Sequence, residues 1–212
     1  MAVSAATGPS SRLAWKRRLA LVQDATLVCV SALFFYIHAA KAMEGNLTNA
    51  AFAVEQGLLV FMFLSRRRSV ATTTRPIDWL VAAGGWLPLL MRPTDTGGTA
   101  ALAGSILQGA GLTMTCVGFV YLGRSFGVVA ANRGLKTAGP YRLVRHPIYF
   151  SHTVTSIGFC LANPSALNLG LFALTLACQL LRIRAEERVL SATAAYSAYR
   201  AEVRWRLIPG LY

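Results

Sequence analysis

The chain has 212 residues, of which 55% are hydrophobic and 14% are charged, and its formal net charge is +13. Soluble domains carry about 25% charged residues, so this composition argues against an ordinary soluble domain. The excess of basic residues does not indicate nucleic-acid binding, because cations that flank membrane helices account for it. We therefore expect an integral membrane protein of one domain, with no nucleic-acid partner.

Long apolar blocks predict an all-α, polytopic membrane bundle of four spans and a C-terminal helical hairpin. A bilayer core needs about 20 helical residues. The spans are expected at about 19–40, 49–64, 77–91 and 100–122. The next apolar stretch, 147–181, is interrupted by Pro164, which removes a backbone donor and favours two shorter helices. Residues 1–18 are expected to form a flexible basic tail with no signal-peptide cleavage site.

Basic residues gather on alternate loops, which predicts how the chain is oriented in the membrane. The two intervening loops hold only Lys41 and Arg92. Cytoplasmic loops accumulate lysine and arginine, so the N- and C-termini are both expected on the cytoplasmic side. The basic positions expected there are Arg12, Lys16, Arg17, Arg18, Arg66, Arg67, Arg68, Arg75, Arg124, Arg133, Lys136, Arg142, Arg145, Arg182, Arg184 and Arg188.

Polar and thiol side chains within the apolar blocks are expected to be structural. Ionisable groups within membrane spans usually face the bundle interior. We expect Asp24, His38, Glu55 and Gln56 to form structural pairs rather than to bind a substrate. The cysteines form no metal-binding spacing, so reduced thiols are predicted and no metal site. The cysteine positions are Cys29, Cys116, Cys160 and Cys178.

Two segments concentrate chemically capable side chains at the expected cytoplasmic interface. These are "GPYRLVRHPIYFSH" at 139–152 and "LLRIRAEERVL" at 180–190. Each has a structural alternative, because His146 could cap local backbone, and Arg182 and Glu186 are spaced for a surface ion pair. The tyrosines could belong to the aromatic belt of a membrane surface. The glycines of the preceding loop lack a strand–turn–helix context, so we expect no Rossmann site.

Four short motifs occur in a fixed order in the C-terminal half. They are LGR-S-F, L-x-x-x-G-P-Y, R-x-x-R-H-P-x-Y and R-x-x-x-E-E-x-x-L. Over about 121–211 the chain resembles the isoprenylcysteine carboxyl methyltransferase family, and the combination of the four motifs in this order is specific to that resemblance. This family is grouped with the phospholipid N-methyltransferases. The resemblance implies a membrane methyltransferase domain at 19–212 that uses S-adenosylmethionine. Its spans would lie at 19–122 and its cofactor-binding half at 123–212.

The resemblance also implies which residues form the site. Glu186 matches a cofactor-binding glutamate, Arg182 matches an arginine on the substrate side, and both are implied for catalysis together with His146. A glutamate can pair with the cationic cofactor, and an arginine can bind a carboxylate in a bidentate manner. The residues implied for cofactor binding are Arg133, Gly134, Leu135, Lys136, Tyr141, His146, Pro147, Ile148, Tyr149, Glu186 and Glu187.

The methyl acceptor is expected to be a lipophilic small molecule or a prenylated substrate that enters from the bilayer. A carboxylate acceptor needs no strong base, whereas an amine must lose a proton, for which His146 or Glu186 are candidates. Departures from the family pattern at Ala194, Ala195 and Glu202 leave the acceptor open. Carboxyl O-methylation of isoprenylcysteine is the first expectation, and N-methylation of a phospholipid or another lipid amine is the alternative. A non-catalytic membrane scaffold and a reductase related to the sterol reductases are the competing classes.

Overall fold

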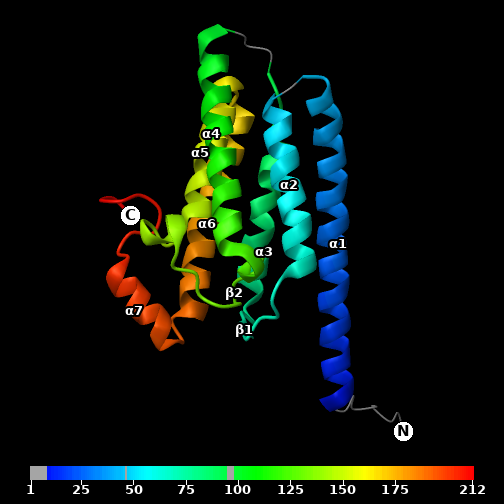
Figure 1. The fold of residues 1–212 in the computed structure, drawn as a ribbon, viewed down its shortest axis with the longest axis vertical. Helices are drawn as coiled ribbons and strands as arrows, with labels where there is room; N and C mark the ends of the chain where they lie inside the picture. The colour runs from blue at the N-terminus through cyan, green and yellow to red at the C-terminus, as the bar shows by residue number, and fades with distance from the viewer. Residues whose placement is uncertain (1–8, 46, 95–97) are drawn as a thin grey trace.

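The computed structural model describes residues 9–45, 47–94 and 98–212, and most of them are helical (Figure 1). This confirms the expectation of a mostly helical chain. The described α-helices are α1 (Pro9–Met43), α2 (Leu47–Ser65), α3 (Pro76–Ala83), α4 (Gly98–Leu122), α5 (Pro147–Ala162), α6 (Ala166–Leu190) and α7 (Ala194–Glu202). Short 3-10 helices are η1 (Gly84–Leu90), η2 (Gly123–Ser125) and η3 (Gly139–Arg142). Two strands that were not predicted, β1 (Ala71–Thr72) and β2 (Ala131–Asn132), form a small antiparallel sheet.

Three of the described helices are long and apolar enough to cross a membrane. The corresponding segments are Asp24–Met43, Gly98–Ser125 and Ala166–Leu190. Two shorter apolar helical segments, Asn49–Ser65 and Pro76–Leu90, coincide with the second and third expected spans. The total number of spans stays a prediction. α1 begins at Pro9, so it includes part of the segment expected to be a flexible tail, and the rest of that segment lies outside the described residues.

The long helices run alternately up and down the bundle (Figure 1). The start of α1, both strands and the end of α6 therefore lie at one end of the molecule, which we call the sheet end. α5 and α6 form the predicted hairpin, and Ser165 caps α6 by accepting a hydrogen bond from the Asn168 backbone. At the opposite end the buried Asn168 side chain donates to Arg92 O at 2.9 Å and Asn163 O at 2.8 Å, which ties the hairpin tip to the chain before α4.

Small residues allow α4 and α5 to pack very closely. A Cβ atom at Gly104 would lie 2.5 Å from the Ala162 backbone nitrogen, and one at Gly158 would lie 2.5 Å from the Gln108 nitrogen. Close backbone approach at small residues is typical of helix pairs in membranes. A hydrogen bond of 2.8 Å from Thr115 Oγ1 to Ser151 Oγ joins the two helices nearer the sheet end. α4 therefore fixes the position of α5.

The C-terminal tail folds back onto the start of α5. The backbone nitrogens of Arg145 and His146 donate to the carbonyls of Trp205 and Arg206, both at 2.9 Å. Leu207 packs against Tyr149 and Ile183 in one hydrophobic cluster. The tail thereby holds the N-terminus of α5 against the C-terminal part of α6. All four cysteines are free in the described structure.

Candidate functional site

A cavity of about 360 Å³ opens among α2, η1, α4, α5, α6 and the loop that follows α4. This volume lies in the range of about 300–1,000 Å³ found for small-molecule sites. The cavity brings together nearly all of the side chains implied by the sequence motifs. Those that line it are Arg133, Gly134, Leu135, Lys136, Tyr141, His146, Pro147, Ile148, Tyr149, Arg182 and Glu186.

Glu186 receives contacts from two residues at the start of α5. Tyr149 donates its phenolic hydrogen to Glu186 Oε1, and His146 Nδ1 lies 3.8 Å from Glu186 Oε2. The Glu186 side chain keeps 24% of its exposure, so its carboxylate remains accessible from the cavity. The start of α5 and the last turns of α6 thus meet at this carboxylate, which can attract a cationic ligand.

Arg182 lies one turn before Glu186 on α6 and also lines the cavity. Its guanidinium lies 5.2 Å from the centre of the Tyr149 ring and donates to Val128 O at 2.8 Å. A Cβ atom at Gly85 would lie 2.8 Å from Arg182 Nη1, so glycine leaves room for the guanidinium. The stacking and the backbone bond hold a positive charge beside the cavity, where it can bind an anionic group.

Arg133 brings a second positive charge into the cavity from the end of β2. Burial lowers the pKa of Arg133, and the nearby Glu186 carboxylate partly opposes this effect. The next residue, Gly134, has a backbone φ of +99°, a conformation that favours glycine. Near Glu186 the cavity therefore presents a carboxylate together with the guanidinium groups of Arg133 and Arg182, which suits a ligand that carries charges of both signs.

Residues 96–195 match the family model described as phospholipid methyltransferase. Over this segment the chain is similar to that family. The match contains α4, α5, α6 and every site residue implied by the motifs, and it confirms the resemblance to the membrane methyltransferases at the level of the family. No match was found among curated proteins. The apolar helices, together with this match, indicate an integral membrane protein.

Glu187 differs from the other implied residues of this methyltransferase segment, because it does not line the cavity. Consecutive helical residues do not face the same side, so Glu187 points away from the face that carries Glu186. Its buried carboxylate contacts Arg145 Nε at 2.9 Å, His146 Nε2 at 3.3 Å and Arg206 Nη2 at 3.0 Å. Glu187 therefore holds the His146 ring and the C-terminal tail in place.

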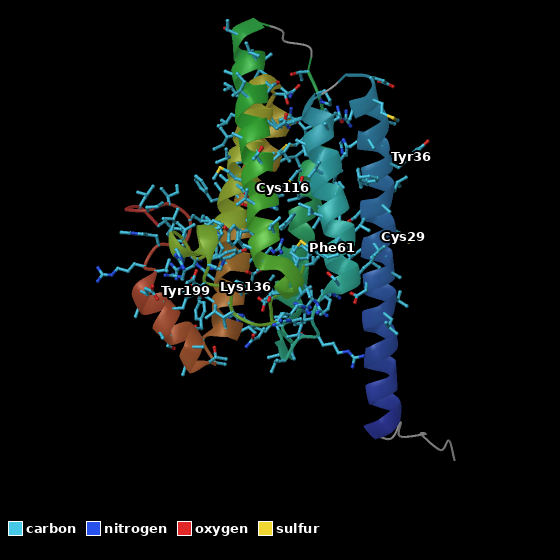
Figure 2. All side chains as sticks on the ribbon, viewed as in Figure 1. Cys29, Tyr36, Phe61, Cys116, Lys136 and Tyr199 are labelled. Atoms are coloured by element: carbon cyan, nitrogen blue, oxygen red, sulfur yellow. The ribbon has the colours of Figure 1, made fainter. Side chains whose placement is uncertain are left out.

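Two tyrosines of α7, for which no role was predicted, also line the cavity. Tyr196 and Tyr199 are three residues apart, so they share one helix face, and they pack with Leu135 of the cofactor segment. Figure 2 shows Lys136 and Tyr199 at the sheet end, beside α7 and the end of α6. Tyr199 donates to Tyr141 O at 2.6 Å, and burial raises the pKa of Tyr199 to about 12.

A second polar pair lies deeper in the bundle and also lines the cavity. Glu55 of α2 is buried, and its Oε1 lies 3.6 Å from His152 Nε2 on α5. Glu55 was expected to pair with another polar residue of the first two spans, but its partner, His152, lies on α5. Asp24 likewise pairs with Arg66 instead, and His38 Nδ1 lies 2.7 Å from Asn49 Oδ1.

Glu55 was expected to pair structurally with other ionisable groups of the spans, and for that reason it was not predicted to be part of the site. Glu55 falls outside the matched family segment, whereas His152 falls inside it. The usable signal was the cost of an ionisable group in a span, which places such residues toward the bundle interior. The cavity consequently has a charged part near Glu186 and a mostly apolar part that contains the Glu55–His152 pair.

Proposed function

We propose that the protein transfers a methyl group from S-adenosylmethionine to a lipophilic acceptor at the membrane. The observation that carries this proposal is the convergence of His146 and Tyr149 on Glu186 within one cavity. The cavity belongs to a segment similar to the phospholipid methyltransferase family, which supports methyl transfer as the reaction. A protein of this family that only bound lipid would not require this combination of charges.

The cavity residues fit the chemistry of S-adenosylmethionine. Glu186 would pair with one of its two cationic groups, and Arg133 would bind its α-carboxylate. The rings of Tyr141 and His146 offer aromatic faces for the adenine or the sulfonium. When bound, the cofactor supplies an electrophilic methyl group. The protein's part is to align the acceptor with that group in a site from which water is largely excluded.

Two acceptor classes fit the cavity. Arg182 favours a carboxylate such as that of isoprenylcysteine, which needs no base because it is already ionised at neutral pH. The Glu55–His152 pair favours an amine or hydroxyl acceptor, because a buried carboxylate repels another carboxylate and attracts N–H and O–H donors. The apolar part of the cavity would hold the lipophilic portion of either acceptor.

The test of the proposal is ligand binding followed by turnover in detergent. Isothermal titration should show saturable binding of both S-adenosylmethionine and S-adenosylhomocysteine. Lipid extracts incubated with the protein and a methyl-labelled donor should then yield a labelled lipid identifiable by mass spectrometry. The absence of saturable heat with either ligand would remove the proposal. Saturable binding of a nicotinamide cofactor in their place would favour a reductase.

A further inference from the structure

A second cavity of about 420 Å³ is lined by residues of α1, of β1 and of the segments that follow α2 and β2. It is lined by four arginines that come from two separate parts of the chain. Arg66, Arg67 and Arg68 follow the end of α2, and Arg133 follows β2. We call these residues the arginine cluster. A preference for basic residues in cytoplasmic loops explains their number, but it does not explain why they converge on one cavity.

The small sheet is what brings the two parts of the arginine cluster together. β1 and β2 pair with Ala71 opposite Asn132 and Thr72 opposite Ala131. The pairing is extended by a hydrogen bond of 2.8 Å from Val70 N to Asn132 O. On the other side of the cluster, Arg67 N donates to Arg124 O at 2.7 Å. The backbone that carries the arginines is therefore held in place before any ligand binds.

The charges in the arginine cluster are not balanced by the residues that line the cavity. Asp24 is the one carboxylate among the described lining residues, and it is already bonded to Arg66 Nε at 3.2 Å. Burial lowers the pKa of Arg66, and the positive charge of Arg133 lowers it further, so these two guanidiniums repel each other. Arg133 Nε is also buried without a hydrogen-bond partner among the described residues. An anion between the guanidiniums would offset the repulsion between Arg66 and Arg133 and could accept a hydrogen bond from Arg133 Nε.

We propose that the arginine cluster binds a phosphate group, either from an anionic phospholipid headgroup or as free phosphate. A tetrahedral phosphate can accept hydrogen bonds from several guanidinium groups at once, which matches donors that approach from two chain segments. Basic pockets among membrane helices are suited to phospholipid headgroups. Trp79 and Leu21 add an exposed aromatic and an apolar surface to the lining, which favours the lipid as the source.

The arginine cluster adjoins the first cavity, because Arg133 lines both. Arg67 lies beside the same segment, with its Nη1 3.7 Å from the position that a Cβ atom of Gly134 would occupy. A phosphate bound to Arg67 and Arg133 would thus steady the segment that precedes Lys136. Phosphate binding does not depend on the proposed methyl transfer and can be measured without the methyl donor.

The test titrates the full-length protein in neutral detergent and follows Trp79 fluorescence, with W79F as the control for the origin of the signal. The probes are inorganic phosphate, dihexanoyl phosphatidylglycerol and dihexanoyl phosphatidylcholine. We expect saturable quenching by phosphatidylglycerol that weakens as salt is added. R67Q/R68Q should lower the affinity at least tenfold. R75Q/R200Q removes the same charge from exposed arginines outside the cavity and should keep the affinity within twofold.

The probes distinguish the two sources of phosphate. Tighter binding of phosphatidylglycerol than of inorganic phosphate supports a lipid headgroup, and equal binding supports free phosphate. The proposal is overturned if R67Q/R68Q, folded as judged by its thermal unfolding, binds these probes as tightly as the unaltered protein. Equal affinity for phosphatidylcholine and phosphatidylglycerol also overturns it, because the arginine cluster would then not recognise the negative charge of the headgroup. So does the absence of both saturable quenching and calorimetric heat with every probe.

Discussion

His146 Nδ1 lies 3.8 Å from Glu186 Oε2, although His146 precedes α5 and Glu186 lies in the last turns of α6. The C-terminal tail makes this proximity possible, because the His146 backbone nitrogen donates to Arg206 O and the Glu187 carboxylate contacts the Arg206 side chain. The charged part of the cavity therefore depends on three segments: the start of α5, the end of α6 and the tail.

The first prediction concerns Glu186 as the group that binds the cationic donor. E186Q keeps the side-chain shape but removes the negative charge, so we expect at least a 30-fold loss in affinity for S-adenosylmethionine, which corresponds to about 2 kcal/mol. Isothermal titration measures this loss. E202Q removes a charge from an exposed glutamate of α7 outside the cavity and serves as the matched control. Unchanged donor affinity in E186Q would show that the donor lies elsewhere.

The second prediction separates Glu187 from Glu186. Removing one partner of a buried ion pair leaves an uncompensated charge, so E187Q should lower the free energy of unfolding by about 3 kcal/mol. E186Q should change it much less, because the Glu186 side chain is partly exposed and does not contact Arg145 or Arg206. Unfolding in mixed detergent gives both values. A stability of E187Q equal to that of the unaltered protein would contradict the positioning role assigned to this carboxylate.

A third prediction concerns the Glu55–His152 pair. E55Q and H152Q should leave the affinity for S-adenosylmethionine within twofold, because Glu55 and His152 lie outside the charged part of the cavity near Glu186. If the acceptor is an amine or hydroxyl, both variants should lower its methylation at least tenfold. Turnover of a primary-amine lipid and of a farnesylated cysteine, compared in each variant, measures the effect. E44Q, which changes an exposed glutamate outside the cavity, is the control. Equal losses with both acceptors would show that the pair does not select between them.

The fourth prediction is a loss of stability at alkaline pH. An unfolded tyrosine has a pKa of about 10, and burial raises the pKa of Tyr199 to about 12. The folded protein keeps this proton over a range in which the unfolded chain loses it. The contribution is therefore fully present below pH 10 and is lost as the pH rises from about 10 to about 12. Burial likewise raises the pKa of Tyr141 and Tyr196, so the three tyrosines act in the same direction.

Unfolding in mixed detergent between pH 8 and pH 11 measures this dependence. Y199F should be less stable at pH 8, because it loses the 2.6 Å bond to Tyr141 O, and its stability should fall less steeply above pH 10. Y36F changes an exposed tyrosine of α1 and should leave the slope unchanged. An equal slope in Y199F and the unaltered protein would indicate that Tyr199 does not keep its proton over this range.

Much of the fold could be predicted because apolar segments and helix-breaking residues can be recognised from the local sequence. The hairpin at Pro164 and the helical blocks follow directly from them. The small sheet could not be predicted, since two-residue strands carry no alternating pattern. Glu187 was assigned to the cofactor because the motif contains two adjacent glutamates, and only the direction of each side chain on α6 separates their roles. Glu55 could be placed toward the bundle interior from the cost of an ionisable group in a span, but its proximity to the motifs arises from packing.

The glycines between α4 and α5 have a mechanical consequence. With backbone touching backbone at Gly104 and Gly158, the two helices can neither slide nor tilt apart independently. Gly158 lies about 18 Å along the helix axis from His146, at 1.5 Å per residue. One added methyl group at Gly158 would have to displace α5 sideways. Because a helix is rigid along its axis, the displacement would also move the His146 imidazole at the other end of α5.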